Sequence, residues 1–123
     1  MSIERMPTRD GVVAAARSVA GILPPTPLLP VEIAGVPIHV KAEALQPIGS
    51  FKIRGAWWRL ANLSAEERGR GVVAVSSGNH AQGVAWAARR LSISAAIVMP
   101  RDAPRVKWSG AERFWSTPSP THG

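Results

Sequence analysis

Two short segments of the sequence contain side chains that could do chemistry. The first segment runs from Ser50 to Ala56 and places Lys52 in the first turn of an expected helix. The positive end of a helix dipole disfavours a charged ammonium group and so favours the neutral amine that attacks a carbonyl carbon. An ordinary surface lysine is the alternative, because this position alone does not distinguish the two.

The second segment is Ser76-Ser77-Gly78-Asn79-His80, between an apolar run and the next expected helix. Backbone amides at such a junction can bind a carboxylate or phosphate without any basic side chain. Gly78 permits close approach, Asn79 can donate to a phenolic or carbonyl oxygen, and the Ser77 hydroxyl suits proton transfer. The alternative is that Ser76 or Ser77 only caps the helix and that His80 is a solvated residue.

Three elements around the second segment predict an α/β fold. Val72–Val75 is a short apolar run rich in β-branched residues, typical of a strand buried on both faces of a parallel sheet. Asn79–Leu91 has helical spacing of apolar residues, and Ala95–Met99 is a second buried strand. A strand, a helix and a strand of this length close as a right-handed βαβ unit.

The upstream half predicts two helices and one strand. Thr8–Ala20 reads as a helix that Thr8 or Asp10 can cap, with Gly21 as a left-handed stop. Leu23–Pro30 holds four prolines and is expected to be a connector. Apolar and polar residues alternate over Val36–Ala42, which predicts a strand with one face exposed to solvent. Phe51–Leu63 reads as a helix whose apolar stripe begins at Phe51.

Composition excludes several classes of function. The 123 residues include no cysteine, which removes disulfides, thiolate nucleophiles and cysteine-ligated metals. The net charge is +7, but the basic residues are dispersed and tyrosine is absent, so we expect no nucleic-acid partner. No apolar run reaches the roughly 18 residues of a membrane span, and no secretory pattern opens the chain. We therefore expect a soluble, cytoplasmic protein without a membrane partner.

Taken together, the two segments closely resemble those of pyridoxal-phosphate enzymes of the tryptophan-synthase β-subunit fold type. Within that group, residues 50–56 and 76–83 are most similar to the threonine dehydratase and serine racemase branch. The resemblance extends from about residue 23 to residue 107 and includes Thr26-Pro27-Leu28 and Lys41-Ala42-Glu43. The cysteine synthase branch is less similar, because its lysine follows a different sequence.

The resemblance implies roles for individual residues. Lys52 would be the Schiff-base lysine and the base that removes the substrate α-proton, and Phe51 would pack beside the pyridine ring. Asn79 would bond the ring hydroxyl oxygen, and the loop from Ser76 to His80 would hold the substrate carboxylate. Ser77 would be a second acid/base in a racemase and a carboxylate ligand in a dehydratase. The implied cofactor is pyridoxal 5′-phosphate, and the implied reaction converts L-threonine or L-serine to a 2-oxo acid and ammonia.

The resemblance also predicts a domain organisation. Residues 1–22 would form an N-terminal helix, and residues 23–107 the N-terminal part of a catalytic domain with a small βαβ subdomain from about residue 50. Residues 108–123 form a divergent, proline-rich tail. One hypothesis for the tail is a reading-frame slip, because codons for Phe114-Trp115-Ser116 read one nucleotide earlier can encode Val-Leu-Val. Full-length members of the family are commonly homo-oligomers.

Two parts implied by the resemblance are missing from the sequence. They are the glycine-rich loop for the cofactor phosphate, since no run of three glycines occurs, and the polar residue that faces the pyridine nitrogen. We therefore expect weak cofactor binding and no turnover by this chain alone. The alternatives are a noncatalytic remnant or anion-binding interaction module, and racemisation of the serine racemase type. Ser92 stands where the family usually has glycine and would strain a left-handed turn by roughly 1 kcal/mol.

Overall fold

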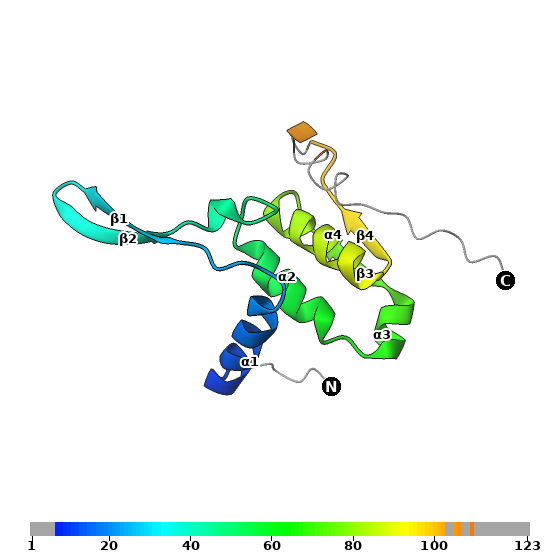
Figure 1. Cartoon of the computed structure of the whole chain (residues 1–123). Coiled ribbons are helices and arrows are strands. Elements are labelled where there is room, and N and C mark those ends of the chain that lie inside the picture. The colour runs from blue at the N-terminus through cyan, green and yellow to red at the C-terminus, as the bar shows by residue number, and fades with distance from the viewer. Residues whose placement is uncertain (1–6, 103–104, 107–108, 110–123) are drawn as a thin grey trace.

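A computed structural model describes residues 7–102, 105–106 and 109 of the chain. It contains an N-terminal helix, an extended β-hairpin and a βαβ unit against which a further helix packs (Figure 1). In chain order the elements are α1 (Arg9–Ala20), β1 (Leu28–Ile33), β2 (Val36–Lys41), the 3₁₀ turn η1 (Glu43–Leu45), α2 (Lys52–Ala61), α3 (Ala65–Arg70), β3 (Val72–Val75), α4 (Asn79–Leu91) and β4 (Ala95–Val98).

The predicted βαβ unit and the α/β fold class are confirmed. β3 and β4 pair in parallel, with Val72 opposite Ala95, and α4 connects them. The expectation that both faces of the strands are buried is wrong, because Val73 and Val75 are each 75% exposed. In the described part of the chain α4 covers one face of the two strands, where Ala74 is buried, and the opposite face is open.

α2 begins at Lys52, so Lys52 lies in the first turn of the helix as predicted. The helix ends at Ala61, two residues before the predicted end at Leu63. The Ser50 hydroxyl accepts a hydrogen bond from the Lys52 amide at 3.1 Å and so supports this start. Phe51 does not belong to the buried stripe that was expected, because its side chain is 59% exposed. The core between α2 and α4 is apolar, and its buried members include Ile53, Ala56, Leu60, Val84, Ala87 and Ala88.

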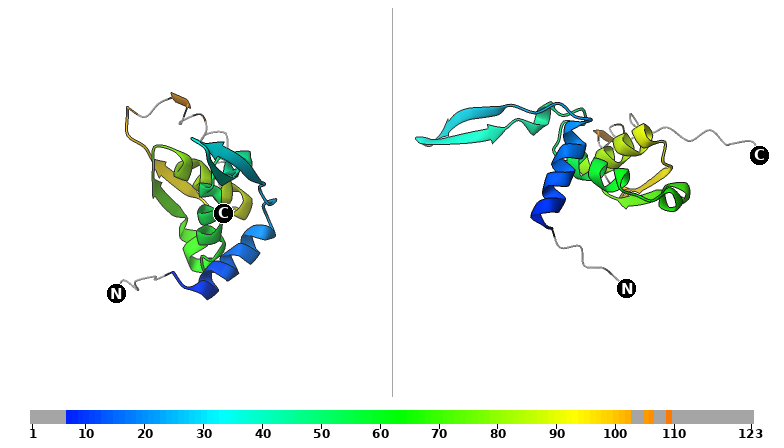
Figure 2. Two further views of the ribbon diagram at one scale, coloured as in Figure 1. Left: turned by 90° about the vertical axis from the view of Figure 1, so that its left-hand side faces the viewer. Right: turned by 60° about the horizontal axis from the view of Figure 1, so that its bottom comes forward.

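The predicted strand Val36–Ala42 is present as β2, and it forms a β-hairpin with β1, which was not predicted. β1 and β2 pair antiparallel through the two-residue turn Ala34–Gly35, in which both residues have positive φ, 50° and 77°. Such turns match the twist of the two strands they join. The hairpin projects away from the helices in Figures 1 and 2, and nearly all of its residues are exposed.

The prediction that Leu23–Pro30 is only a connector is wrong for its last three residues, which begin β1. Proline interrupts the hydrogen bonds of a central strand, but it is tolerated in an edge strand. Both strands of an isolated hairpin are edge strands, so Pro30 and Pro37 fit within this one.

α1 begins as predicted and ends differently. The Thr8 hydroxyl caps it by accepting from the Gly11 amide at 3.0 Å. Gly21 has φ −74° and ψ −13°, so the expected left-handed stop is wrong. The Gly21 amide instead donates to the Arg17 carbonyl at 3.3 Å and continues a right-handed turn.

Two contacts attach α1 to α2. Val19 is buried in the core, and the Trp57 indole donates a hydrogen bond to the Ser18 hydroxyl at 3.1 Å.

Ser92, at the end of α4, adopts the left-handed conformation that was expected of its position, with φ 55° and ψ 39°. The predicted tail of residues 108–123 lies outside the described residues except for residue 109.

Candidate active site

Lys52 is the first residue of α2, and its side chain is exposed. Its Nζ lies 5.3 Å from the centroid of the Phe51 ring, within range of a cation–π contact. Among the described residues no carboxylate forms an ion pair with this amine. The amine is therefore available to a ligand, beside an exposed aromatic face.

A charged cluster behind Lys52 holds the start of α2 in place. Arg54 donates from Nε to Oε2 of Glu43 at 2.8 Å and from Nη2 to Oε1 at 2.7 Å. The Thr26 hydroxyl donates to Oε1 at 2.6 Å, and the Gln46 amide donates to Oε2 at 3.3 Å. The guanidinium of Arg54 is the main cause that lowers the pKa of Glu43 from 4.5 to about 2. Glu43 therefore ties Thr26 and Gln46 to the first turn of the lysine-bearing helix.

The Lys41 side chain also contacts this cluster. Its Nζ donates to the Thr26 carbonyl at 3.1 Å and lies 3.7 Å from Oε1 of Glu43. No role in the site was predicted for Thr26, Glu43 or Arg54. The signal that could have indicated this cluster was the pair of charged residues Lys41 and Glu43, at the end of the alternating strand and directly after it.

In the loop between β3 and α4, a serine side chain accepts hydrogen bonds from some of the backbone amides. The Ser76 hydroxyl accepts from the amides of Gly78 and Ala81, both at 3.2 Å, which is the capping geometry held open as an alternative. The amides of Ser77, Asn79 and His80 have no acceptor within the described part of the chain. These amides and the positive end of the α4 dipole are suited to binding a carboxylate.

The two chemical segments lie together because α2 and α4 pack closely at their first turns. A Cβ placed on Gly83 would lie 3.2 Å from the Lys52 carbonyl oxygen and 3.2 Å from the Ala56 Cβ. Gly83 is one helical turn after Asn79, so both helix N-termini are at the same end of the pair. No sequence signal distinguished Gly83 from an ordinary helical glycine.

The predicted site is an exposed wall rather than a closed pocket. Phe51, Lys52, Asn79 and His80 are exposed, while Ser77 and its neighbours are half-buried. A cavity of about 470 Å³ lies beside β3, and of the predicted site residues only His80 lines it. No group of three His, Asp or Glu residues suited to a metal ion occurs in the described ranges.

Comparison with known proteins identifies the family. The family described as pyridoxal-phosphate dependent enzyme matches residues 19–114, well over half of the chain. This chain belongs to that family of pyridoxal-phosphate enzymes. The resemblance proposed from residues 50–56 and 76–83 is therefore confirmed.

Relatives of this pyridoxal-phosphate enzyme chain include lyases and a racemase. An L-threonine ammonia-lyase of Thermotoga maritima is 62% identical over 76 residues, which are 62% of this chain and 19% of that protein. The structure of threonine deaminase isoform 2 from Solanum lycopersicum matches with TM-score 0.72 and 39% identity, over 85% of this chain and 30% of the other. The structure of maize serine racemase matches with TM-score 0.78 and 34% identity, over 86% of this chain and 34% of the other. The chain thus spans about a third of these solved structures and less of the curated lyase.

The residues on this wall fit one side of a bound pyridoxal phosphate. The fit rests on the unpaired Lys52 amine, the exposed Phe51 ring beside it and the Asn79 side chain at the first turn of α4. The glycine-rich loop expected for the phosphate is not among these residues, since the 123 residues contain no run of three glycines.

Proposed function

We propose that this chain forms the lysine-bearing wall of the active site of an enzyme that deaminates a small hydroxy amino acid. The proposed reaction converts L-threonine or L-serine to a 2-oxo acid and ammonia. The observation that carries the proposal is the packing of two helix N-termini, one bearing Lys52 and the other bearing free amides. The lyase relatives support this choice of reaction.

Each part of the wall has a proposed task. Lys52 would hold the cofactor and would accept the proton from the substrate α-carbon, and Phe51 would pack beside the pyridine ring. The amides of Ser77, Asn79 and His80 hold the substrate carboxylate, and the Asn79 side chain donates to the ring oxygen. Pyridoxal phosphate supplies an electron sink for the α-carbon when it is bound. The hydroxyl group would leave the β-carbon as water, and one water molecule would be taken up when the carbon–nitrogen bond is hydrolysed. Each amino acid would therefore give one 2-oxo acid and one ammonia.

The lysines of the chain provide an internal test. Lys41, Lys52 and Lys107 are the complete set. We expect reductive trapping with pyridoxal phosphate and borohydride to label Lys52 in preference to Lys41, whose amine is engaged by Thr26 and Glu43. Peptide mass spectrometry locates the label.

Matched variants sharpen this test. Lys41→Arg should leave the labelled fraction unchanged, and Lys52→Arg should abolish the dominant labelled peptide. Equal labelling of Lys41 and Lys52 would show that the site does not select its lysine, and the proposal would fail.

Racemisation is the second candidate, favoured by the match to maize serine racemase. In that reaction Ser77 would be the acid/base on the face opposite Lys52. Release of D-serine from L-serine, lost in Ser77→Ala, distinguishes racemisation from release of pyruvate. Saturable binding of an anion with neither product would favour the noncatalytic module.

Location, domains and assembly complete the proposal. We propose a cytoplasmic enzyme with residues 23–107 as part of its catalytic domain, assembled from identical subunits. None of the described helices combines the length and apolarity that a membrane span requires.

A further inference from the structure

Three backbone contacts fix the helical turn that carries Lys52. The Lys52 amide donates to the hydroxyl of the buried Ser50 at 3.1 Å. The Arg54 amide donates to the Phe51 carbonyl at 3.1 Å and so closes the first turn of α2. The Lys52 carbonyl oxygen lies close to α4, where a Cβ on Gly83 would be only 3.2 Å away. The backbone from which the Lys52 side chain extends is therefore held on both of its neighbouring sides.

The ion pair between Glu43 and Arg54 adds an orientation to this turn. Arg54 donates from Nε and Nη2 to the two carboxylate oxygens of Glu43, at 2.8 Å and 2.7 Å. Two parallel hydrogen bonds fix the angle between the two groups as well as their distance. Both side chains are partly buried, so water weakens their attraction less than it does at an open surface. The pair therefore fixes the start of α2 against the segment that precedes it.

Glu43 can act as an anchor because other residues hold its carboxylate. The Thr26 hydroxyl donates to it at 2.6 Å, and the amide of the buried Gln46 donates at 3.3 Å. The Ala42 amide donates to the Pro27 carbonyl at 2.9 Å, which keeps Thr26 and Glu43 close together. The carboxylate is thus attached to the base of the β-hairpin on one side and to α2 on the other.

We propose that Glu43 and Arg54 are positioning residues that direct the Lys52 amine towards a bound pyridoxal phosphate. This inference rests on the proposed function, in which Lys52 holds the cofactor. A lysine side chain has a long and flexible stem, so the places that its amine can reach depend on the turn from which the stem extends. Reacting groups must be held to within about 0.5 Å, and a misplacement of about 1 Å can lower a rate about a hundredfold.

The test compares two reagents on the Lys52 amine of the full chain. Labelling by pyridoxal phosphate and borohydride requires an amine that is placed correctly for the cofactor, whereas formaldehyde and cyanoborohydride methylate any accessible amine. Peptide mass spectrometry gives both rates at Lys52, and their ratio reports its positioning. We expect Glu43→Gln and Arg54→Met each to lower this ratio about tenfold, with circular dichroism showing that the variants are folded. A ratio equal to that of the parent chain in both variants overturns the proposal.

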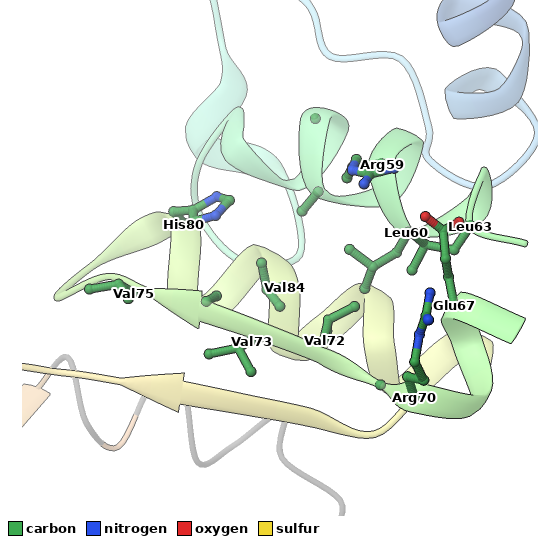
Figure 3. A pocket seen from close by; sticks show the side chains of 14 residues that line it. Arg59, Leu60, Leu63, Glu67, Arg70, Val72, Val73, Val75, His80 and Val84 are labelled. Carbon is green, nitrogen blue, oxygen red and sulfur yellow. The ribbon is translucent and has the colours of Figure 1, made fainter. Parts of the chain in front are cut away.

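Two control variants make the same changes in charge elsewhere. Arg59→Met removes a guanidinium from the part of α2 that lines the cavity beside β3 (Figure 3). Glu66→Gln breaks an exposed ion pair, in which the carboxylate lies 3.1 Å from Nη1 of Arg70. Both controls should keep the ratio of the parent chain. An equal fall in the controls would show a general effect of charge on the anionic reagent and would refute the positioning role.

A double variant tests whether the two residues act as one unit. If Glu43 and Arg54 position Lys52 through their ion pair, the double variant Glu43→Gln/Arg54→Met should lose no more than the larger of the two single losses. Losses that multiply would show independent effects and would contradict the pair. Arg54→Lys keeps the charge but cannot form two parallel bonds, so it should lower the ratio at least twofold. This milder variant decides the question if the other variants do not fold, and an unchanged ratio would then count against the proposal.

The parent chain distinguishes failure of this inference from failure of the proposed function. Equal labelling of Lys41 and Lys52 by pyridoxal phosphate in the parent chain would refute both, because no lysine would be selected. Preferential labelling of Lys52 in the parent chain, together with an unchanged ratio in Glu43→Gln and Arg54→Met, would refute only the positioning role.

Discussion

At the scale of single residues, Glu43 shows how a charge can position another side chain without touching a substrate. Its carboxylate accepts from Thr26, Gln46 and Arg54, and its side chain is 16% exposed. Hydrogen bonds to a charged carboxylate stabilise the ionised form, which is why the pKa of Glu43 falls to about 2. Arg54 is two residues from Lys52, so this cluster sets where α2 starts.

The lowered pKa of Glu43 predicts the pH dependence of stability. A carboxyl group whose pKa is lower in the folded chain than in the unfolded chain stabilises the fold when ionised. This stabilisation is complete above the usual value of 4.5 and is lost as pH falls towards about 2. We expect the free energy of unfolding to fall by about 2 to 3 kcal/mol across that window, measured by urea denaturation at successive pH values.

Substitution of Glu43 tests whether this carboxylate, and not another, causes the pH dependence of stability. Glu43→Gln should flatten this pH dependence and, at neutral pH, lower the free energy of unfolding by about 1 to 3 kcal/mol, because Arg54 loses its partner. Glu66→Gln is the control, since the Glu66 carboxylate pairs with Arg70 at 3.1 Å but is 80% exposed. An unchanged slope in Glu43→Gln would refute the assignment.

At the scale of elements, the contact between α2 and α4 brings the two chemical segments together. The approach is possible because Gly83 has no side chain at the point where the helices meet. The left-handed turn at Ser92 ends α4, and the chain then continues into β4. The site is thus a property of helix packing as much as of the residues that line it.

Gly83→Ala tests this packing. The added methyl group would meet the Lys52 carbonyl and Ala56 at 3.2 Å, so we expect a loss of about 1 to 3 kcal/mol in the free energy of unfolding. Chemical denaturation measures the loss, and reductive trapping should show less label on Lys52.

A neighbouring glycine provides the matched control. A Cβ on Gly55 of α2 meets no atom within 4 Å, so Gly55→Ala should stabilise the helix by up to about 1 kcal/mol. If both variants had the same effect, close helix approach would not explain Gly83.

At the scale of the whole molecule, the described chain has an apolar face that its own elements leave open. Val73 and Val75 are each 75% exposed and Val98 is 54% exposed, on the side of the sheet away from α4. The matched part of this chain spans 34% of maize serine racemase and 30% of the tomato threonine deaminase structure, so these relatives have further chain with which to cover such a face.

Polar substitution of this face should change association but not folding. Val73→Thr, Val75→Thr and Val98→Thr together keep β-branched side chains, so each should change the free energy of unfolding by less than about 0.5 kcal/mol. Static light scattering at rising concentration should show less association than in the parent chain. Ile53→Thr, at a site that is 0% exposed, is the control and should lose about 2 kcal/mol or more. Strong destabilisation by the triple variant would show that the face is covered.

The parts of the fold that could be predicted from the sequence depend on local patterns. The starts of α1 and α2, the βαβ unit and the left-handed Ser92 follow from caps, periodicity and short apolar runs. β1 was not predicted because the four prolines of Leu23–Pro30 indicated a connector. The structure shows a strand there because an edge strand tolerates proline. Burial on both faces was wrongly expected because composition does not tell how much chain is present to cover a sheet.

The sequence by itself determined the family. It also predicted Lys52 and the segment from Ser76 to His80 as the chemically active residues, because they stand in recognisable local patterns. Only the tertiary structure decided that these two segments meet, because their meeting depends on a glycine contact between helices far apart in sequence. It also decided that Glu43 and Arg54 hold the lysine-bearing turn. Contacts of this kind are set by three-dimensional packing, which no local pattern of residues records.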